Sequence, residues 1–168
     1  MKVGGGAYKI DIFPSRNFFT SRFFLPTGYP TQLLESENGI PLLQLGPLVL
    51  QKQYSALARP QTDHMKKQQK QQNDILDADT AIQYLDVLLP MHFKSIISES
   101  QTECVHHEQK FWRLVAQLHP NKYRELLNRW QQVLDKSLTH MSHNERVQWE
   151  PYYLAMKNPT QQTSGPSS

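Results

Sequence analysis

The stretch from His119 to Leu134 constrains the fold of this chain more than any other. Its apolar residues, and those just beyond it, recur at intervals of three and four, the spacing that lines one face of an α-helix. They are Tyr123, Leu126, Leu127, Trp130, Val133, Leu134, Leu138 and Met141. Pro120 suits the first helical position, where its missing N–H costs nothing. We predict a helix that begins at Pro120 and forms the spine of the core, with Trp130 buried.

The same spacing recurs in other segments of residues 75–157. One segment is interrupted by Pro90, where the helix kinks or a new helix begins. The next is predicted to be capped at Thr102. The last opens at Ser142 with Glu145 three residues later, which is the capping-box pattern of a helix N-terminus. We therefore predict a mainly α-helical fold, with a bundle of four or five helices over residues 75–157.

The composition changes before this bundle. Residues 1–60 hold six of the seven glycines and six of the eleven prolines, which predicts an extended N-terminal arm of short strands and turns. Residues 61–74 contain one apolar side chain and are interpreted as a polar Lys/Gln linker or an exposed helix extension. Residues 158–168 are predicted to be a flexible tail.

Aromatic side chains are concentrated in the arm. Five of the seven phenylalanines lie between positions 13 and 24, and arginines accompany them. So short a segment cannot hide that much apolar surface on itself, and interface energy concentrates in aromatic and arginine anchors. We therefore predict that the arm docks onto a partner through Arg16, Phe18, Phe19, Arg22, Phe23 and Phe24.

The net charge of +3 is unevenly distributed. Residues 1–72 hold nine Lys/Arg against four Asp/Glu, whereas residues 73–100 hold one against five. Either the two parts meet within the fold, or the basic part contacts an anionic partner. The sequence has neither an apolar run long enough to cross a bilayer nor the apolar block of a signal peptide, and Cys104 is its single cysteine. We expect a cytoplasmic protein.

Cysteine and histidine residues could form a zinc site or a catalytic pair. Zinc accepts sulfur and imidazole ligands, and Cys104, His107, His140 and His143 form two pairs with ligand spacing. The first pair would lie inside a helix, so we expect ordinary helix-end histidines and an incidental cysteine. Cys104 with His107 lacks a recognisable orienting group and oxyanion donors, and no glycine loop has a phosphate-binding pattern. We expect no cofactor and no enzymatic activity.

These observations favour a non-enzymatic accessory or adaptor subunit that binds another protein or a second copy of itself. A nucleic-acid-binding accessory protein is the alternative, because lysines and arginines accompany the phenylalanines. A small zinc-stabilised helical module is the third interpretation. Nothing in the sequence identifies a small-molecule substrate.

Overall fold

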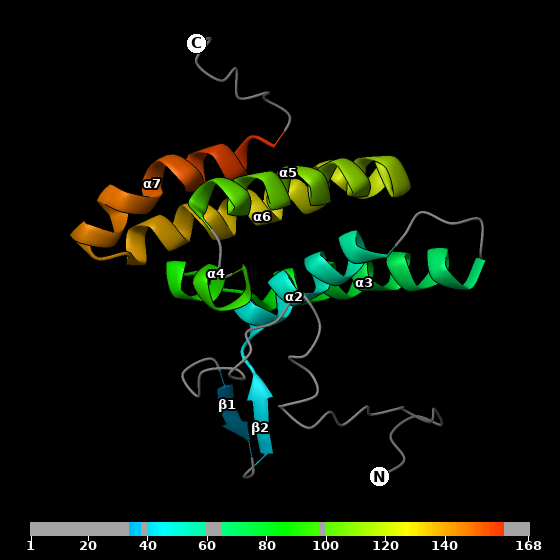
Figure 1. Ribbon diagram of the computed structural model, residues 1–168, viewed down its shortest axis with the longest axis horizontal. Helices are drawn as coiled ribbons and strands as arrows, with labels where there is room; N and C mark the ends of the chain where they lie inside the picture. Colours follow the sequence, from blue (N-terminus) through cyan, green and yellow to red (C-terminus); the bar gives the residue numbers. More distant parts are fainter. Residues whose placement is uncertain (1–33, 38–39, 60–64, 98–99, 160–168) are drawn as a thin grey trace.

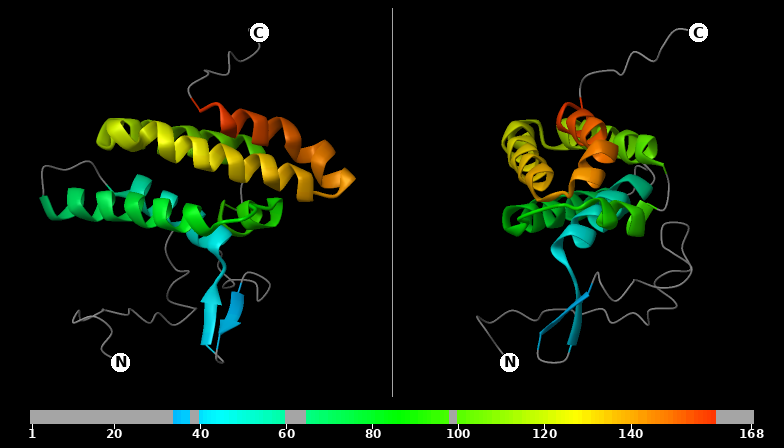
Figure 2. Two further views of the ribbon diagram at one scale, coloured as in Figure 1. Left: turned by 180° about the vertical axis from the view of Figure 1, so that it is seen from behind. Right: turned by 90° about the vertical axis from the view of Figure 1, so that its left-hand side faces the viewer.

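The protein folds into two layers of helices. Its structure is a computed structural model that describes residues 34–37, 40–59, 65–97 and 100–159. In Figures 1 and 2, α2, α3 and α4 form one layer and α5, α6 and α7 form the other. The predicted mainly α-helical character is confirmed. The helices are α2 (Leu45–Ala58), α3 (Met65–Tyr84), α4 (Pro90–Ile97), α5 (Gln101–Leu118), α6 (Pro120–His140) and α7 (His143–Lys157).

A short hairpin precedes the helices. Strand β1 (Leu34–Glu37) pairs antiparallel with β2 (Ile40–Leu43), with Leu34 opposite Leu43 and Glu37 opposite Ile40. The chain then leads directly into the first turn of α2 (Figure 1). The aromatic segment of the predicted arm, with Arg16, Phe18, Phe19, Arg22, Phe23 and Phe24, lies outside the described residues.

Helix α2 differs from the extended arm predicted for residues 1–60. Its first turn contains Gly46 and Pro47, two of the residues whose frequency in residues 1–60 predicts an extended arm. Proline is tolerated there because the first amide groups of a helix have no partner within the helix. Its buried positions include Val49, Leu50 and Ala56, each 0% exposed, so this helix belongs to the core.

The polar segment 65–74 is part of α3, as in the second of its two interpretations. Its side chains Met65 to Lys70 are exposed, but Gln71 and Asp74 lie on the buried face. The Gln71 amide donates to the Ala56 carbonyl at 2.8 Å, and Arg59 Nε donates to Asp74 at 2.6 Å. These bonds to α2 order a segment whose composition alone would not form a core.

Helix starts follow local chemistry. Pro90 is the first residue of α4 and Pro120 the first of α6, so the restart at Pro90 and the predicted start at Pro120 are confirmed. The predicted cap at Ser142 is also confirmed, with Glu145 completing its capping box. The cap of α5 is Ser100 rather than Thr102, because Ser100 pairs reciprocally with Glu103.

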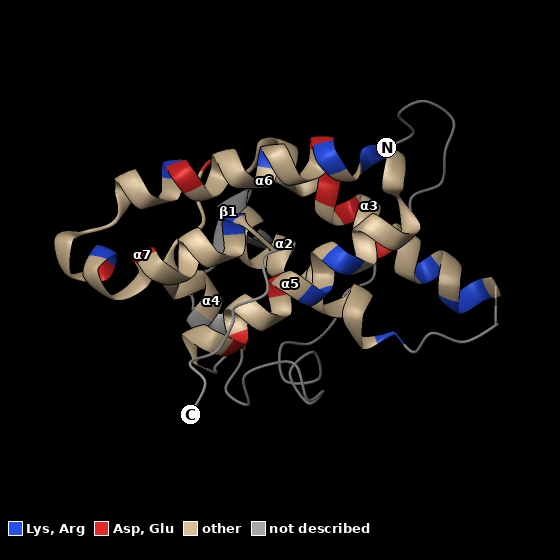
Figure 3. Ribbon diagram, turned by 90° about the horizontal axis from the view of Figure 1, so that it is seen from above, with Lys and Arg blue, Asp and Glu red and all other residues tan. Residues whose placement is uncertain are grey.

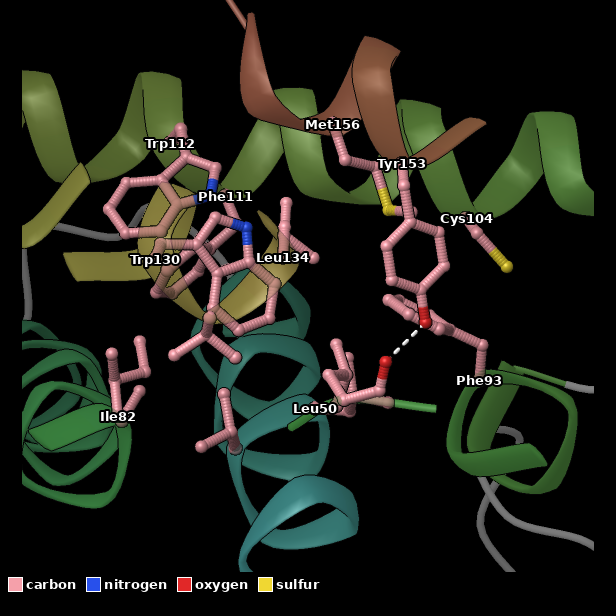
Figure 4. Close-up of a cluster of buried hydrophobic side chains, with 14 of the residues drawn as sticks. Leu50, Ile82, Phe93, Cys104, Phe111, Trp112, Trp130, Leu134, Tyr153 and Met156 are labelled. Atoms are coloured by element: carbon pink, nitrogen blue, oxygen red, sulfur yellow. Dashed lines mark hydrogen bonds between the residues drawn. The ribbon is translucent and has the colours of Figure 1, made fainter. Parts of the chain in front are cut away.

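The core lies between the two layers. Trp130 is 0% exposed, as predicted, and packs near Trp112 with 6.2 Å between ring centroids. Figure 4 shows both indoles between α5, α6 and α2, and Tyr153 of α7 reaching towards the other layer. There the Tyr153 hydroxyl donates to the Leu88 carbonyl, while the Leu88 N–H donates to Ser137 Oγ at 2.7 Å. Among the described residues, no helix is both long and apolar enough to cross a membrane.

Candidate functional site

A hollow in the described surface runs between α2 and α5. It consists of two adjoining parts of about 540 Å³ and 380 Å³ that share Leu57 and Lys110. We name it the α2–α5 groove. The larger part is lined by Tyr54, Leu57, Ala58, Glu103, His106, His107 and Lys110, and the smaller by Leu57, Arg59, Gln71, Lys110, Arg113, Leu114 and Gln117.

The α5 wall of the groove is one face of that helix. Glu103, His106, Lys110, Arg113 and Gln117 follow one another at intervals of three and four, so they project on the same side. All five side chains are exposed. The opposite face of α5 carries core residues, which explains why the apolar spacing alone did not reveal this polar stripe. The signal was present in the sequence as a second periodicity on the same helix.

The floor of the groove is apolar. Leu57 is half-buried and Leu114 is 6% exposed, and both pack on the core. Tyr54 covers the ring of His107, with the two ring centroids 3.7 Å apart and the planes 18° from parallel. Both nitrogens of His107 are buried without a hydrogen-bond partner. Burial, followed by the positive charge of Lys110, lowers the pKa of His107 to about 3, so this imidazole is neutral at physiological pH.

Three cations line the smaller part of the groove, and they differ in whether they form an ion pair. Arg59 is paired with Asp74 of α3 at 2.6 Å. Lys110 and Arg113 make no ion pair or hydrogen bond with the part of the chain that the structure describes. Figure 3 shows these basic segments of α5 in the middle of the view. The groove can therefore offer two solvent-facing cations beside an apolar floor.

A buried polar cluster lies beneath this surface, on the inner side of α5. The Glu108 side chain is fully buried, and its Oε2 accepts from Trp112 Nε1 at 3.0 Å and from Gln53 Nε2 at 3.5 Å. Burial raises the pKa of Glu108 to about 8, against the hydrogen bonds, which favour the charged form. Glu108 Oε1 and Gln53 Oε1 have no donor. A protonated Glu108 carboxyl adds a hydrogen-bond donor to this cluster.

The structure does not assemble the four zinc candidates. Cys104 is buried and faces the core beside Tyr153 (Figure 4). His107 lies under Tyr54, whereas His140 ends α6 and His143 begins α7, both exposed. Among the described residues, no three His, Cys, Asp or Glu side chains are grouped to hold a metal ion.

The acidic segment 73–100 contacts cations from both sides. Lys52 of α2 lies 2.7 Å from Asp77, and Arg129 of α6 lies 3.1 Å from Asp79. Lys136 also pairs with Asp86. Figure 3 shows acidic segments of α3 beside basic segments of α6. Part of the charge asymmetry in the sequence is therefore satisfied within the fold.

No protein-family model matches this chain, and no match was found among curated proteins or solved structures. The case for a function therefore depends on the geometry of the groove and on the sequence patterns.

Proposed function

We propose that this protein is a non-enzymatic accessory or adaptor subunit of a larger protein assembly, and that the α2–α5 groove is the docking surface of its helical part. The single observation behind this proposal is the groove itself, in which Leu57 and Leu114 lie beside the unpaired cations Lys110 and Arg113. Protein interfaces commonly combine an apolar centre with arginine anchors and a polar rim. The aromatic arm is proposed as a second contact, and the cytoplasm as the compartment, which suits a sequence with a single cysteine.

Nucleic acid is the second candidate because of the start of α3. Lys66, Lys67 and Lys70 are exposed there, and Gln71, the next residue, lines the groove. Five cations without a carboxylate partner in the described residues would then lie near one another, which suits a polyanion. Tyr54, the aromatic ring in the lining of the larger part, already stacks on His107, and the floor at the basic end is formed by the aliphatic side chains Leu57 and Leu114, so bases find little to stack on there. The groove therefore favours a protein.

The test is retrieval of the full chain, carrying an affinity tag, from the cells that produce it, in the presence of a nuclease. We expect one partner protein to be retained by the tagged chain. When the tag is placed on that partner instead, the partner should retrieve the chain. The two purified proteins should form a stoichiometric complex. The double variant Lys110→Glu/Arg113→Glu should lose this complex. The matched control Lys122→Glu/Arg124→Glu changes the same charge at exposed positions of α6 outside the groove and should retain it.

Two results would contradict the proposal. Retention that disappears with nuclease, together with binding of a single-stranded oligonucleotide that weakens steeply with salt, would support the nucleic-acid alternative. A chain that retains no protein and reconstitutes no complex would exclude an adaptor role.

A further inference from the structure

The carboxylates from Asp74 to Glu150 whose positions the structure describes are already engaged. In the described residues from Asp74 to Glu150, each Asp or Glu side chain whose position is described accepts from a donor in the same chain. Lys110 and Arg113 have no such partner among the described residues. A cation beside an apolar floor gains most from an anion that arrives with apolar groups of its own.

The chain has few carboxylates left to fill this site itself. In the segments whose placement is not described, the sequence contains only Asp11, Asp63 and Glu99, each in a different segment. The hairpin that carries Glu35 and Glu37 joins the first turn of α2 (Figure 1), whereas the groove is lined by residues at the other end of that helix. Asp63 follows the groove residue Arg59 by four positions, but one carboxylate cannot match both Lys110 and Arg113, so complementary charge is expected from another molecule.

Charge along the groove separates a peptide from a nucleic-acid strand. Arg59, Lys110 and Arg113 line one end, but Glu103 lies on the wall of the other end. A nucleic-acid strand carries a phosphate at every nucleotide, so a strand along the groove would bring one against Glu103. A peptide can place its carboxylates at one end and neutral side chains at the other.

The length of the wall sets the size of that peptide. From Glu103 to Gln117 the rise of α5 is about 21 Å at about 1.5 Å per residue, so a helix of about 14 residues or an extended strand of about six spans it. We propose that the α2–α5 groove binds a short acidic segment of a partner protein, with its carboxylates against Lys110 and Arg113 and its apolar side chains on Leu57 and Leu114. This inference rests on the function proposed above and names the chemistry of its partner.

The experiment selects the ligand without assuming its sequence. A displayed library of random 14-residue peptides is panned against the full chain, with the double variant Lys110→Glu/Arg113→Glu used to remove peptides that bind elsewhere. We expect enrichment of Asp and Glu clustered at one end, with at least two large apolar residues beyond them. Far-UV circular dichroism of the variant should match that of the native chain, because both side chains are exposed.

Binding is then measured by fluorescence anisotropy with one selected peptide. We expect at least a tenfold loss of affinity in the groove variant and less than a twofold change in the control variant Lys122→Glu/Arg124→Glu. A 14-nucleotide single-stranded DNA should bind more weakly than the peptide at physiological salt. Light scattering tests whether the groove instead binds a second copy of the chain. Such self-association would be lost in the groove variant and prevented by the peptide.

Several outcomes overturn the inference. Selected peptides without acidic enrichment, equal losses in both variants, tighter binding of the oligonucleotide, or self-association as above would each do so. If the natural partner is retained by the groove variant, the adaptor function stands and the groove inference fails. If the acidic peptide binds as expected but no partner protein is found, the groove inference stands and the adaptor function fails.

Discussion

The Glu108 carboxyl lies in an environment very different from that of an exposed glutamate. It is fully buried against Trp112 and Gln53, and its pKa is raised to about 8 from an ordinary 4.5. Between pH 4.5 and about pH 8, the folded protein therefore holds a proton on Glu108 that the unfolded chain releases. The stabilisation linked to this proton is complete below pH 4.5 and declines as pH rises to about 8, by at most about 1.4 kcal/mol per pH unit.

Glu108→Gln should remove that dependence, because an amide keeps the shape and cannot ionise. We expect the variant to exceed the native chain in free energy of unfolding at pH 8 and to lose this advantage by pH 5. Urea titrations at pH 5, 6.5 and 8 measure the difference. His92 and His107 titrate in both proteins and cancel from it.

Glu150→Gln is the matched control for that series, since Glu150 is partly exposed and, among the described residues, pairs with Arg146 at 3.3 Å. Its stability should follow that of the native chain across the same pH range. If the difference in free energy of unfolding between the native chain and Glu108→Gln stays constant with pH, Glu108 is charged in the folded protein.

Trp130 carries a second prediction at this scale. The side chain is 0% exposed, and its removal leaves a cavity between α5 and α6 that the neighbouring rings cannot fill. Trp130→Ala should lower the free energy of unfolding by about 3–5 kcal/mol, as for other large core truncations. Val147→Ala is the control at a side chain that is 67% exposed, and urea unfolding should show almost no change.

At the scale of elements, the contact between α2 and α4 depends on a missing side chain. A Cβ at Gly46 would lie 2.4 Å from His92 Nδ1. The His92 ring is held in place, because it is buried and its Nδ1 accepts from the Leu89 N–H at 3.2 Å. Glycine is therefore required in the first turn of α2 by the approach of α4.

Gly46→Ala should destabilise the protein for this reason, although alanine is ordinarily favoured in a helix by about 1 kcal/mol over glycine. Thermal unfolding of the native chain and the variant shows whether the change in stability is negative, as expected. In a His92→Ala background the same change should become neutral or stabilising, because the atoms that it meets are gone. Equal effects in the two backgrounds would exclude the steric explanation.

The helix boundaries illustrate how much an element reveals by itself. Pro120 and the Ser142–Glu145 pair act within one turn of chain, so their helix starts could be read from sequence. Thr102 was the wrong cap for α5 because Ser100 has the glutamate at the required spacing, Glu103. That signal was also local and could have been found.

For the whole molecule, the described core is built from residues 49–156. Deletion of residues 1–30 should therefore leave the helical far-UV signal and cooperative unfolding in place, while the proposed aromatic arm is removed. We expect association with the partner to be lost or weakened, as measured by size-exclusion chromatography of the reconstituted complex.

A quadruple replacement of Phe18, Phe19, Phe23 and Phe24 by Ser is the matched variant for that deletion, because it keeps Arg16 and Arg22 and the chain length. It should weaken association to a similar extent. Loss of the helical signal on deletion would instead place the arm in the core and leave the groove as the docking surface.

By itself, the sequence determined the helical class, the spine at Pro120 and the burial of Trp130, because periodicity and caps depend on residues within a few turns. Tertiary structure decided the rest. Gln71 and Asp74 became ordered only because Ala56 and Arg59 lie opposite them. The buried carboxyl of Glu108 and the α2–α5 groove exist only where faces of different helices meet. Which faces meet depends on contacts between residues distant in sequence, and a local pattern carries no record of them.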